Sequence, residues 1–303
     1  MVERTVTTVI DQEKCTGCGL CVRVCPNQTI SMMNGIATVT GNRSMNCGHC
    51  AAVCPVDAVR VAAIDSATLS FDTFEIDKHW LPHGEFNISE LVRLMASRRS
   101  CRNYLDKTVS RETLQDLIKI GVTAPSGTNS QLWTFTLLPN RKSVLELGQH
   151  IGLFFRHLNK MAEKPWLRVL LRWQGKRQLD DYYREHYESV KQALEDWEKS
   201  GRDRLFHGAP AAIVVGSKPG GACPKEDALL ATQNILLAAH CLGLGTCLIG
   251  YAVSVMAEDR NITRQIGIPD EESVHAVIAL GYPDEEYQTV AGRKKIVPRY
   301  FEC

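Results

Sequence analysis

The sequence predicts an α+β protein built from two unequal modules. Seven of the 12 cysteines lie within the first 54 residues, and the rest of the 303-residue chain has an ordinary globular composition. Strand-like and helical segments alternate in that larger part, as in α+β and α/β domains. The length also exceeds that of one average domain. We therefore expect a small module over residues 1–64, a connector over 65–88 and a larger α+β domain over 89–303.

The cysteine spacing of the small module indicates iron–sulfur clusters. A first run reads C-x2-C-x2-C-x3-C-P and a near copy follows; together they comprise Cys15, Cys18, Cys21, Cys25, Cys47, Cys50 and Cys54. Bacterial ferredoxins bind 4Fe-4S clusters with this spacing, and the last cysteine of each run ligates the other cluster. The sequence therefore predicts a ferredoxin-like iron–sulfur domain that transfers electrons.

This crossed ligation divides the cysteines into one complete and one incomplete site. The complete site takes Cys15, Cys18, Cys21 and Cys54, and the other takes Cys25, Cys47 and Cys50. The fourth position of the second site is Ser44, three residues before Cys47. Three outcomes stay open there: a serine oxygen ligand, a non-protein ligand on one iron, or a three-iron cluster. We expect one 4Fe-4S cluster and a second cluster of the 4Fe-4S or 3Fe-4S type.

Zinc and disulfides are the alternative uses of these cysteines. Structural zinc takes four ligands in paired C-x2-4-C knuckles, a different spacing. Disulfides require an oxidising compartment, and no apolar, basic-flanked signal segment precedes the first motif. We therefore expect a cytoplasmic protein. The net charge of +1 without a basic stripe predicts no nucleic-acid partner. The apolar runs fall far short of the ~20 residues of a membrane span, so we expect no membrane partner either.

The small module shows strand patterns but little core. Short strands are expected at Val6–Ile10, Ile36–Val39 and Val59–Ala63. A module of this size buries little apolar surface, so bound clusters are expected to supply much of its folding free energy. Residues 65–88 contain Pro82 and Gly84 without periodicity and are expected to form a connector.

The larger domain carries clearer helix signals. Residues 89–99 place apolar side chains at helical spacing, and a second helix is capped by Ser110, stapled from Val109 onto Leu114 and stopped at Gly121. Strands are expected at Thr134–Leu138, Ala211–Gly216 and Val274–Leu280. The helix over 226–241 is apolar around most of its circumference, which predicts burial in a central core and at a subunit interface.

An insertion over residues 150–207 is rich in aromatic and charged residues. Its apolar residues recur at spacings of three and four from Leu179 to Trp197, which predicts one long helix. One interpretation is simple packing against the main body. The other is a lid whose aromatic residues, with Trp166 or Trp173, close over a flat substrate.

A basic loop follows the first helix of the larger domain. Residues 97–104 read SRRSCRNY and contain Arg98, Arg99, Ser100 and Arg102. Guanidinium groups bind phosphate oxygens in pairs, and the serine adds a hydroxyl, so the loop suits a phosphate. The alternative is that these cations only offset the helix dipole.

Three further segments strengthen the phosphate interpretation. Residues 124–133 read APSGTNSQLW, residues 243–250 read GLGTCLIG, and a basic Arg293-Lys294-Lys295 cluster follows the Gly-Tyr-Pro at 281–283. Together with the SRRSCRNY loop, these segments in this order resemble the nitroreductase-like flavoprotein family. The resemblance extends from Ser89 to the C-terminus.

The resemblance implies a nitroreductase-like α+β fold that binds FMN. It implies phosphate and ribityl contacts from the SRRSCRNY loop and a second phosphate clamp from Arg293. Contacts across a dimer interface are implied for Pro125 and Ser126, and polar contacts to the ribityl or ring edge for Asn129 and Gln131. The stretch along the flavin ring corresponds to Thr246, Cys247 and Leu248. Family members are homodimers with an FMN in each interfacial pocket.

No catalytic side chain stands out in the sequence. It contains no Ser-His-Asp set, H-E-x-x-H or P-loop pattern, so the chemistry is expected to belong to the cofactor. Cys247 is a nucleophile candidate, but its position in an apolar Gly-rich turn favours a packing role.

The fusion of the two modules predicts an electron-transfer function. An external donor, a ferredoxin or an NAD(P)H-linked reductase, would reduce the clusters, and FMN would pass the electrons to a small flat organic acceptor such as a nitro-aromatic, quinone or activated alkene. Covalent attachment raises the effective concentration of donor and acceptor. Two alternatives stay open: an FMN-dependent dehydrogenase that exports electrons through the clusters, and a non-enzymatic carrier or redox sensor.

Overall fold

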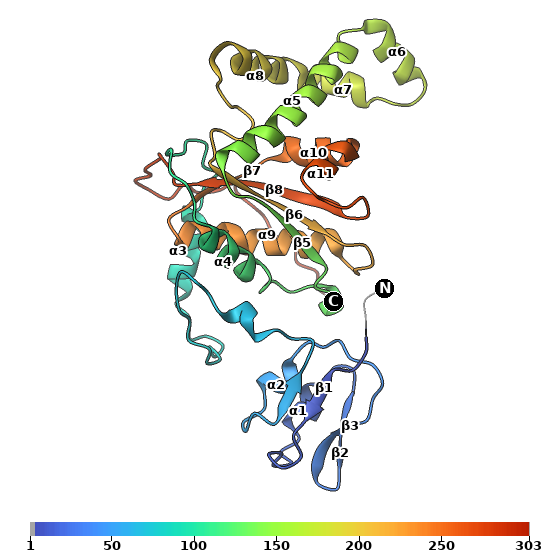
Figure 1. Cartoon of the computed structure of the whole chain (residues 1–303), viewed down its shortest axis with the longest axis vertical. Helices are drawn as coiled ribbons and strands as arrows, with labels where there is room; N and C mark the ends of the chain where they lie inside the picture. Colours follow the sequence, from blue (N-terminus) through green and yellow to red (C-terminus); the bar gives the residue numbers. More distant parts are fainter. Residues whose placement is uncertain (1–3, 303) are drawn as a thin grey trace.

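The larger domain is a four-stranded sheet covered by helices on both faces, and the small module lies beyond one of these helical layers (Figure 1). The computed structural model describes residues 4–302. No helix within these residues has both the length and the apolar character needed to cross a membrane. The predicted α+β class with a small N-terminal module is confirmed.

The small module contains two short antiparallel strand pairs and two short helices. Its elements are β1 (Thr8–Ile10), α1 (Leu20–Val24), β2 (Ile30–Met33), β3 (Ile36–Val39), α2 (His49–Ala52) and β4 (Val59–Val61). Strand β1 pairs with β4, and β2 pairs with β3. The prediction for β3 is confirmed, whereas β1 and β4 are each two residues shorter than expected and β2 was missed. The Asn34-Gly35 turn, with φ angles of 51° and 82°, was the available hairpin signal.

The apolar core of the small module is small, as expected. Its buried residues are Ile10, Cys21, Ile30, Ala37, Cys50, Val59 and Val61. Two of these seven are predicted cluster ligands. Cluster binding and core formation therefore use the same side chains.

A buried carboxylate fastens the connector to the larger domain. The connector contains one short helix, η1 (Ser66–Leu69), and then passes α4 (Arg111–Gly121). Asp116 of α4 is fully buried and accepts hydrogen bonds from the backbone N–H groups of Asp72 and Thr73 at 2.8–3.0 Å. The Thr73 hydroxyl donates to it at 2.7 Å, and Lys119 Nζ lies 3.4 Å away. No local sequence pattern predicts this clamp, because Asp72 and Asp116 are 44 positions apart.

The sheet of the larger domain is antiparallel with the order β5-β6-β8-β7. Its strands are β5 (Trp133–Leu138), β6 (Ala211–Ser217), β7 (Gly245–Leu248) and β8 (Ser273–Gly281). The three predicted strands are confirmed to within one residue at each end. The Gly-rich turn expected around Cys247 was wrong, because those residues form the edge strand β7.

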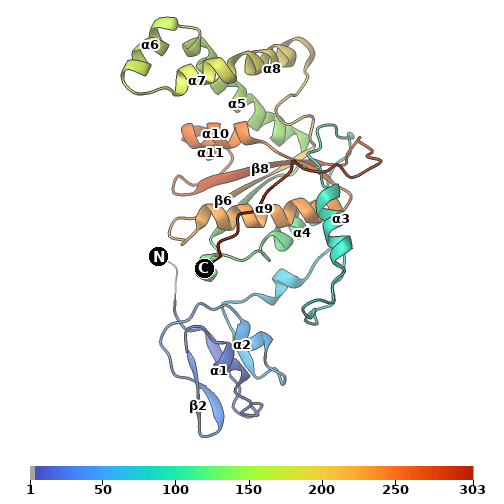
Figure 2. The ribbon, with the colours of Figure 1, turned by 180° about the vertical axis from the view of Figure 1, so that it is seen from behind.

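One face of the sheet carries α3 (Ile88–Ser97), α4 and α9 (Pro224–Cys241), on the side toward the small module (Figure 2). The Ser110 cap is confirmed, since its Oγ accepts from the Thr113 N–H at 3.1 Å. Helix α4 does end at Gly121, but this residue also lets α4 approach α9. A Cβ there would lie 3.0 Å from Ile235.

The apolar helix α9 is buried on one face only. The exposed fractions of Leu229 and Leu230 are 40% and 47%, whereas Ala228, Ala231 and Ile235 are fully buried. The expectation of burial on most sides is therefore not met within one chain.

The other face of the sheet carries α5 (Arg141–Ala162), α10 (Gly250–Glu258) and α11 (Arg260–Gln265). Above them lie α6 (Pro165–Trp173), α7 (Gln178–Glu185) and α8 (Tyr187–Ser200). The prediction of one long helix from Leu179 to Trp197 was wrong, because the backbone breaks at His186 between α7 and α8. Helix α5 runs without interruption through position 150, where the insertion was expected to begin.

Replacing Asp116 should destabilise the protein. The variant Asp116→Asn leaves the Asp72 and Thr73 donors without a carboxylate, so we expect the free energy of unfolding to fall by about 2 to 4 kcal/mol. Denaturant unfolding and limited proteolysis of the connector measure this. Asp181→Asn, an exposed change on α7, is the matched control. Equal stability of the two variants would contradict the clamp.

The same carboxylate should make stability depend on pH. Burial alone would raise the pKa of Asp116, but its hydrogen bonds from Asp72, Thr73 and Lys119 outweigh that effect and lower it. Its contribution is therefore complete at neutral pH and is lost as the pH falls below about 4. Wild type should lose stability over this range more steeply than Asp116→Asn.

Candidate functional site

Two cavities in the small module divide the cysteines as the crossed ligation predicts. One cavity is lined by Cys15, Cys18, Cys21 and Cys54. The other is lined by Cys25, Cys47, Cys50 and Ser44. Each cavity thus receives the last cysteine of the opposite run, which is how two-cluster ferredoxins distribute their ligands.

The cysteines surround these cavities and do not converge on a point. Within residues 4–302, no three His, Cys, Asp or Glu side chains come together closely enough to hold a single metal ion. An iron–sulfur cluster takes each thiolate on a different iron, so cysteines spread around a cavity suit a cluster better than one zinc ion.

A backbone N–H group donates to the sulfur atom of the last cysteine in each run, Cys25 and Cys54. The Thr29 N–H donates to Cys25 Sγ at 3.3 Å, and the Ala58 N–H donates to Cys54 Sγ at 3.2 Å. Burial alone would raise the pKa of the Cys25 thiol, but the hydrogen bonds from Thr29 and nearby backbone groups lower it. The donors to Cys25 favour its thiolate, the form that binds iron.

Ser44 occupies the fourth corner of the second cavity. Its side chain is 8% exposed, and its Oγ accepts from the Asn46 N–H at 3.0 Å. Its own N–H donates to the Arg4 carbonyl at 2.9 Å. A small oxygen donor thus stands where a fourth thiolate would stand.

The basic loop of the larger domain lies against the edge strand β7. Ser100 bridges Thr246, and the Cys101 N–H donates to the Thr246 carbonyl at 2.9 Å. The site is narrow at this point, since a Cβ on Gly245 would lie 2.6 Å from the Cys101 side chain. The structure therefore brings two of the four family-like segments together.

Three guanidinium groups of this loop have no side-chain partner within residues 4–302. Arg98 is half-buried and Arg99 and Arg102 are exposed, and none makes a side-chain hydrogen bond or ion pair within the described residues. A cluster of positive charge without partners is a suitable place for an anion.

Glu285, which sequence reasoning missed, holds the backbone of this loop. Its Oε1 accepts from the Arg102 N–H at 3.0 Å and from Asn103 Nδ2 at 2.8 Å. The Tyr287 hydroxyl donates to its Oε2 at 2.6 Å. No local pattern signals such a contact between residues 183 positions apart.

Cys247 is buried in the core of the larger domain, whereas Arg293 is exposed in the segment after β8. Cys247 is 4% exposed in the main core, and burial raises the pKa of its thiol, which fits packing better than nucleophilic attack. Leu248 is exposed. Arg293 lies in the segment after β8, and its Nη1 contacts only the carbonyls of Ala291 and Gly292 at 3.4 Å. Over residues 4–302, Arg293 makes no hydrogen bond to the basic loop.

The segment from Pro125 to Gln131 is anchored at the start of α9. Asp227 there accepts from the Gly127 N–H at 2.8 Å and from Ser130 Oγ at 3.1 Å. Pro125 is exposed and Ser126 half-buried. Thr128, Asn129 and Gln131 all have positive φ angles of 48–55°, which non-glycine residues rarely adopt. Such strain concentrates at functional sites.

Polar side chains of this segment connect it to the small module. The Gln131 side chain donates to Asn129 Oδ1 at 2.8 Å. Asn129 Nδ2 in turn donates to the carbonyls of Met45 at 2.9 Å and Asn46 at 3.2 Å. The Arg4 guanidinium donates to the carbonyl and the hydroxyl of Thr128 at 2.8 and 2.6 Å. Asn129, expected beside a flavin, thus directs its amide nitrogen to the residues next to Cys47.

The segment and the basic loop lie at opposite corners of the sheet. Trp133 pairs with Ser217, which pairs with Ser273, whereas Thr246 pairs with Leu280. Seven residues of β8 span ~23 Å, and three strand spacings add ~14 Å across the sheet, so the corners are ~27 Å apart. Three of the four family-like segments therefore fall into two separate groups within one chain: the basic loop with β7, and the segment before β5.

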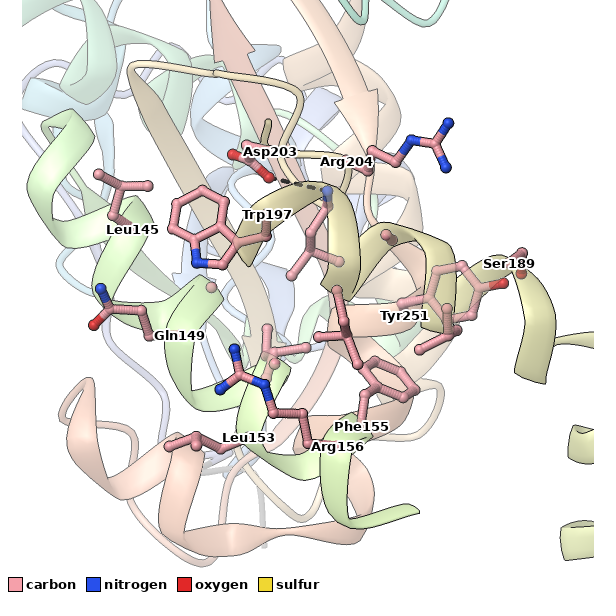
Figure 3. A pocket seen from close by; sticks show the side chains of 17 residues that line it. Leu145, Gln149, Leu153, Phe155, Arg156, Ser189, Trp197, Asp203, Arg204 and Tyr251 are labelled. Atoms are coloured by element: carbon pink, nitrogen blue, oxygen red, sulfur yellow. Dashed lines mark hydrogen bonds between the residues drawn. The ribbon is translucent and has the colours of Figure 1, made fainter. Parts of the chain in front are cut away.

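A cavity of about 610 Å³ lies between α5 and α8 (Figure 3). Phe155, Leu194, Trp197 and Tyr251 contribute apolar surface, and Arg156 contributes a charged group. The cavity has the size and apolar lining of a small-molecule site. Trp166 and Trp173, expected as lid residues, do not line it and are 63% and 85% exposed.

Comparisons with known proteins identify both parts of the chain. The Nitroreductase family model matches residues 95–282, more than half of the chain. The chain belongs to the nitroreductase family. A 4Fe-4S binding domain model matches residues 8–31. The predicted nitroreductase-like domain behind a ferredoxin-like module is therefore confirmed.

Individual relatives cover about two thirds of this nitroreductase-family chain. An iodotyrosine deiodinase from Thermotoga neapolitana is 25% identical over 214 residues, 69% of this chain and 97% of that protein. A 4-nitrobenzoate reductase from Nocardioides sp. is 27% identical over 217 residues, 64% of this chain and 81% of that protein. A nitroreductase structure with bound FMN from Desulfitobacterium hafniense is 27% identical, with a TM-score of 0.50, and covers 72% of this chain and 100% of that chain.

Changing Ser44 to cysteine should complete the second cluster site. Because the side chain already lines the cavity with three cysteines, we expect Ser44→Cys to bind about eight irons per chain. It should also keep its iron longer in air than wild type does. Iron and sulfide analysis of anaerobically purified protein measures the content. Ser44→Ala is the control, and a Ser44→Cys protein that holds less iron than wild type would refute the placement.

Proposed function

We propose that this chain is an iron–sulfur flavoprotein oxidoreductase. It passes electrons from two clusters in its small module to FMN, and from FMN to a small flat organic acceptor such as a nitro-aromatic, quinone or activated alkene. The observation that carries this proposal is the junction at Asn129. A segment that resembles a flavin contact is hydrogen-bonded to the two residues that precede the cluster ligand Cys47.

The basic loop is the proposed phosphate site. Arg98, Arg99 and Arg102 carry three positive charges without partners in the described residues, and Ser100, between them in the sequence, forms the backbone bridge to β7. A phosphate there would receive charge-assisted hydrogen bonds. Glu285 holds the loop through the Arg102 backbone and so leaves the guanidinium free for the ligand.

The flavin site is proposed to require a second copy of the chain. The basic loop and the Pro125–Gln131 segment lie too far apart in one chain to share one flavin, and a homodimer would bring them together. A further observation supports this, because the apolar Leu229 and Leu230 of α9 are exposed in one chain.

The residues of this chain bind and orient the cofactor, and no side chain is assigned a covalent role. Bound FMN would supply the redox chemistry, accepting single electrons and delivering a pair. Thr246 and Cys247 would lie along the ring, and the buried Cys247 would exclude water there. The proposed external donor is a ferredoxin or an NAD(P)H-linked reductase.

The cavity between α5 and α8 is the proposed acceptor site. Tyr251, on its lining, follows Leu248 by three residues, so the cavity lies near the stretch assigned to the flavin ring. Trp197 offers a flat apolar surface on which an aromatic acceptor can stack.

Removing a loop guanidinium should weaken FMN binding. We expect Arg98→Ala or Arg102→Ala to cost about 1 to 3 kcal/mol, the range for a lost charged hydrogen bond. Fluorescence titration of the apoprotein with FMN measures the dissociation constant. Arg93→Ala, on the exposed side of α3, is the matched control. Unchanged affinity in both loop variants would show that the phosphate lies elsewhere.

Removing the cavity tryptophan should weaken acceptor binding. We expect Trp197→Ala to raise the KM for a flat nitro-aromatic or quinone by about tenfold, since stacking of an aromatic pair and its buried area are lost. The flavin content should not change. Trp173→Ala is the control for an exposed tryptophan of the same insertion. Equal KM values for the two variants would place the acceptor outside this cavity.

A further inference from the structure

Only one of the two cluster cavities is joined to the larger domain. Met45 and Asn46 line the second cavity and accept both hydrogen bonds from Asn129. Ser44, on the same cavity, donates its N–H to the carbonyl of Arg4, whose guanidinium binds Thr128. Within residues 4–302, no residue that lines the first cavity makes a hydrogen bond to the larger domain. The two cavities are therefore not equivalent.

The connection from the second cavity to the family-like segment is short. Cys47 follows Asn46 directly in the chain, and one hydrogen bond of 3.2 Å joins Asn46 to Asn129. From Asn129 the contacts continue to Gln131 at 2.8 Å, and the Gln131 N–H donates to Ser126 Oγ at 3.1 Å. The left-handed backbone at Thr128, Asn129 and Gln131 points these groups in directions that ordinary loop conformations do not offer.

This segment is ~27 Å from the basic loop of its own chain, as the strand register shows. A cluster that delivers electrons at Ser126–Gln131 therefore serves a flavin whose phosphate is held by another chain. In a homodimer, that chain is the partner protomer.

We propose that electron transfer in the homodimer is crossed. The second, Ser44-sided cluster of each protomer is the exit cluster, and it reduces the flavin bound by the basic loop of the partner. Asn129 acts as a positioning residue that holds the exit cluster against this flavin. The inference rests on the proposed function, because it requires bound flavin and cluster-fed reduction.

The electron balance is simple. Each cluster carries one electron at a time, so full reduction of one flavin takes two successive electrons and two protons from solvent. A dithionite-reduced ferredoxin supplies the electrons in the test below, and no bond in the protein forms or breaks.

Hybrid dimers with separate defects test the crossed route. The first defect, called the cluster defect, removes two ligands of the exit cluster (Cys47→Ala with Cys50→Ala). The second, called the grip defect, removes two arginines of the basic loop that are proposed to bind the FMN phosphate (Arg98→Ala with Arg102→Ala). In the first hybrid, one chain carries the cluster defect and the other carries the grip defect. In the second hybrid, one chain carries both defects and its partner is wild type. Different affinity tags on the two chains allow each hybrid to be purified anaerobically.

The two hybrids give opposite results for the crossed route and for a direct route, in which each cluster reduces the flavin bound by the basic loop of its own chain. The crossed route predicts that the flavin of the first hybrid bleaches at the wild-type rate, whereas the flavin of the second bleaches only at the background rate of the cluster-defective homodimer. Stopped-flow absorbance of the flavin is the readout, and iron and flavin content confirm the intended loading. The reverse pattern would overturn the inference. Absence of cluster-dependent bleaching in the wild-type dimer would refute the proposed function itself.

Removal of the Asn129 amide tests the positioning role. Asn129→Ala loses both hydrogen bonds to the module, so we expect flavin bleaching to slow about tenfold. The iron content, the flavin content and the cluster electron paramagnetic resonance signals should match those of wild type. Asn234→Ala, which loses a single hydrogen bond to Thr123, is the matched control. A wild-type bleaching rate in Asn129→Ala would remove the positioning role.

Discussion

The hydrogen bonds from Asn129 to the carbonyls of Met45 and Asn46 determine how the two modules can work together. They attach a strained polar segment of the larger domain to the backbone next to Cys47. Arg4 reinforces the attachment through Thr128, and its carbonyl is itself bound by Ser44. Together with the connector, these contacts place the second cavity against a defined segment of the larger domain.

The second constraint is the register of the sheet. Because β5 and β7 are the two edge strands, the segment that precedes β5 and the loop that pairs with β7 lie at opposite corners. The basic loop and the Pro125–Gln131 segment, which are proposed to bind one flavin, therefore lie apart in one chain. The exposed leucines of α9 are consistent with a surface that a second copy covers. The proposal of crossed electron transfer rests on these two constraints together.

Local sequence patterns predicted much of the fold and the cysteines that line the two cavities of the small module. The cysteine spacing predicted the division into two cavities because the ligands of each run are close in sequence, and the Ser110 cap was readable for the same reason. Long-range contacts were not readable. The clamp of Asp116 on the connector, the hold of Glu285 on the basic loop and the partners of Asn129 join residues that are distant in sequence. The apolar stripe across α7 and α8 continued past His186, so periodicity alone did not reveal the break.

The most direct test of the account follows cluster and flavin absorbance in the wild-type protein after anaerobic mixing with a reduced ferredoxin. If electrons enter through the small module, the clusters bleach first and recover their colour as the flavin bleaches. Direct bleaching of the flavin by NAD(P)H while the clusters stay oxidised would contradict it.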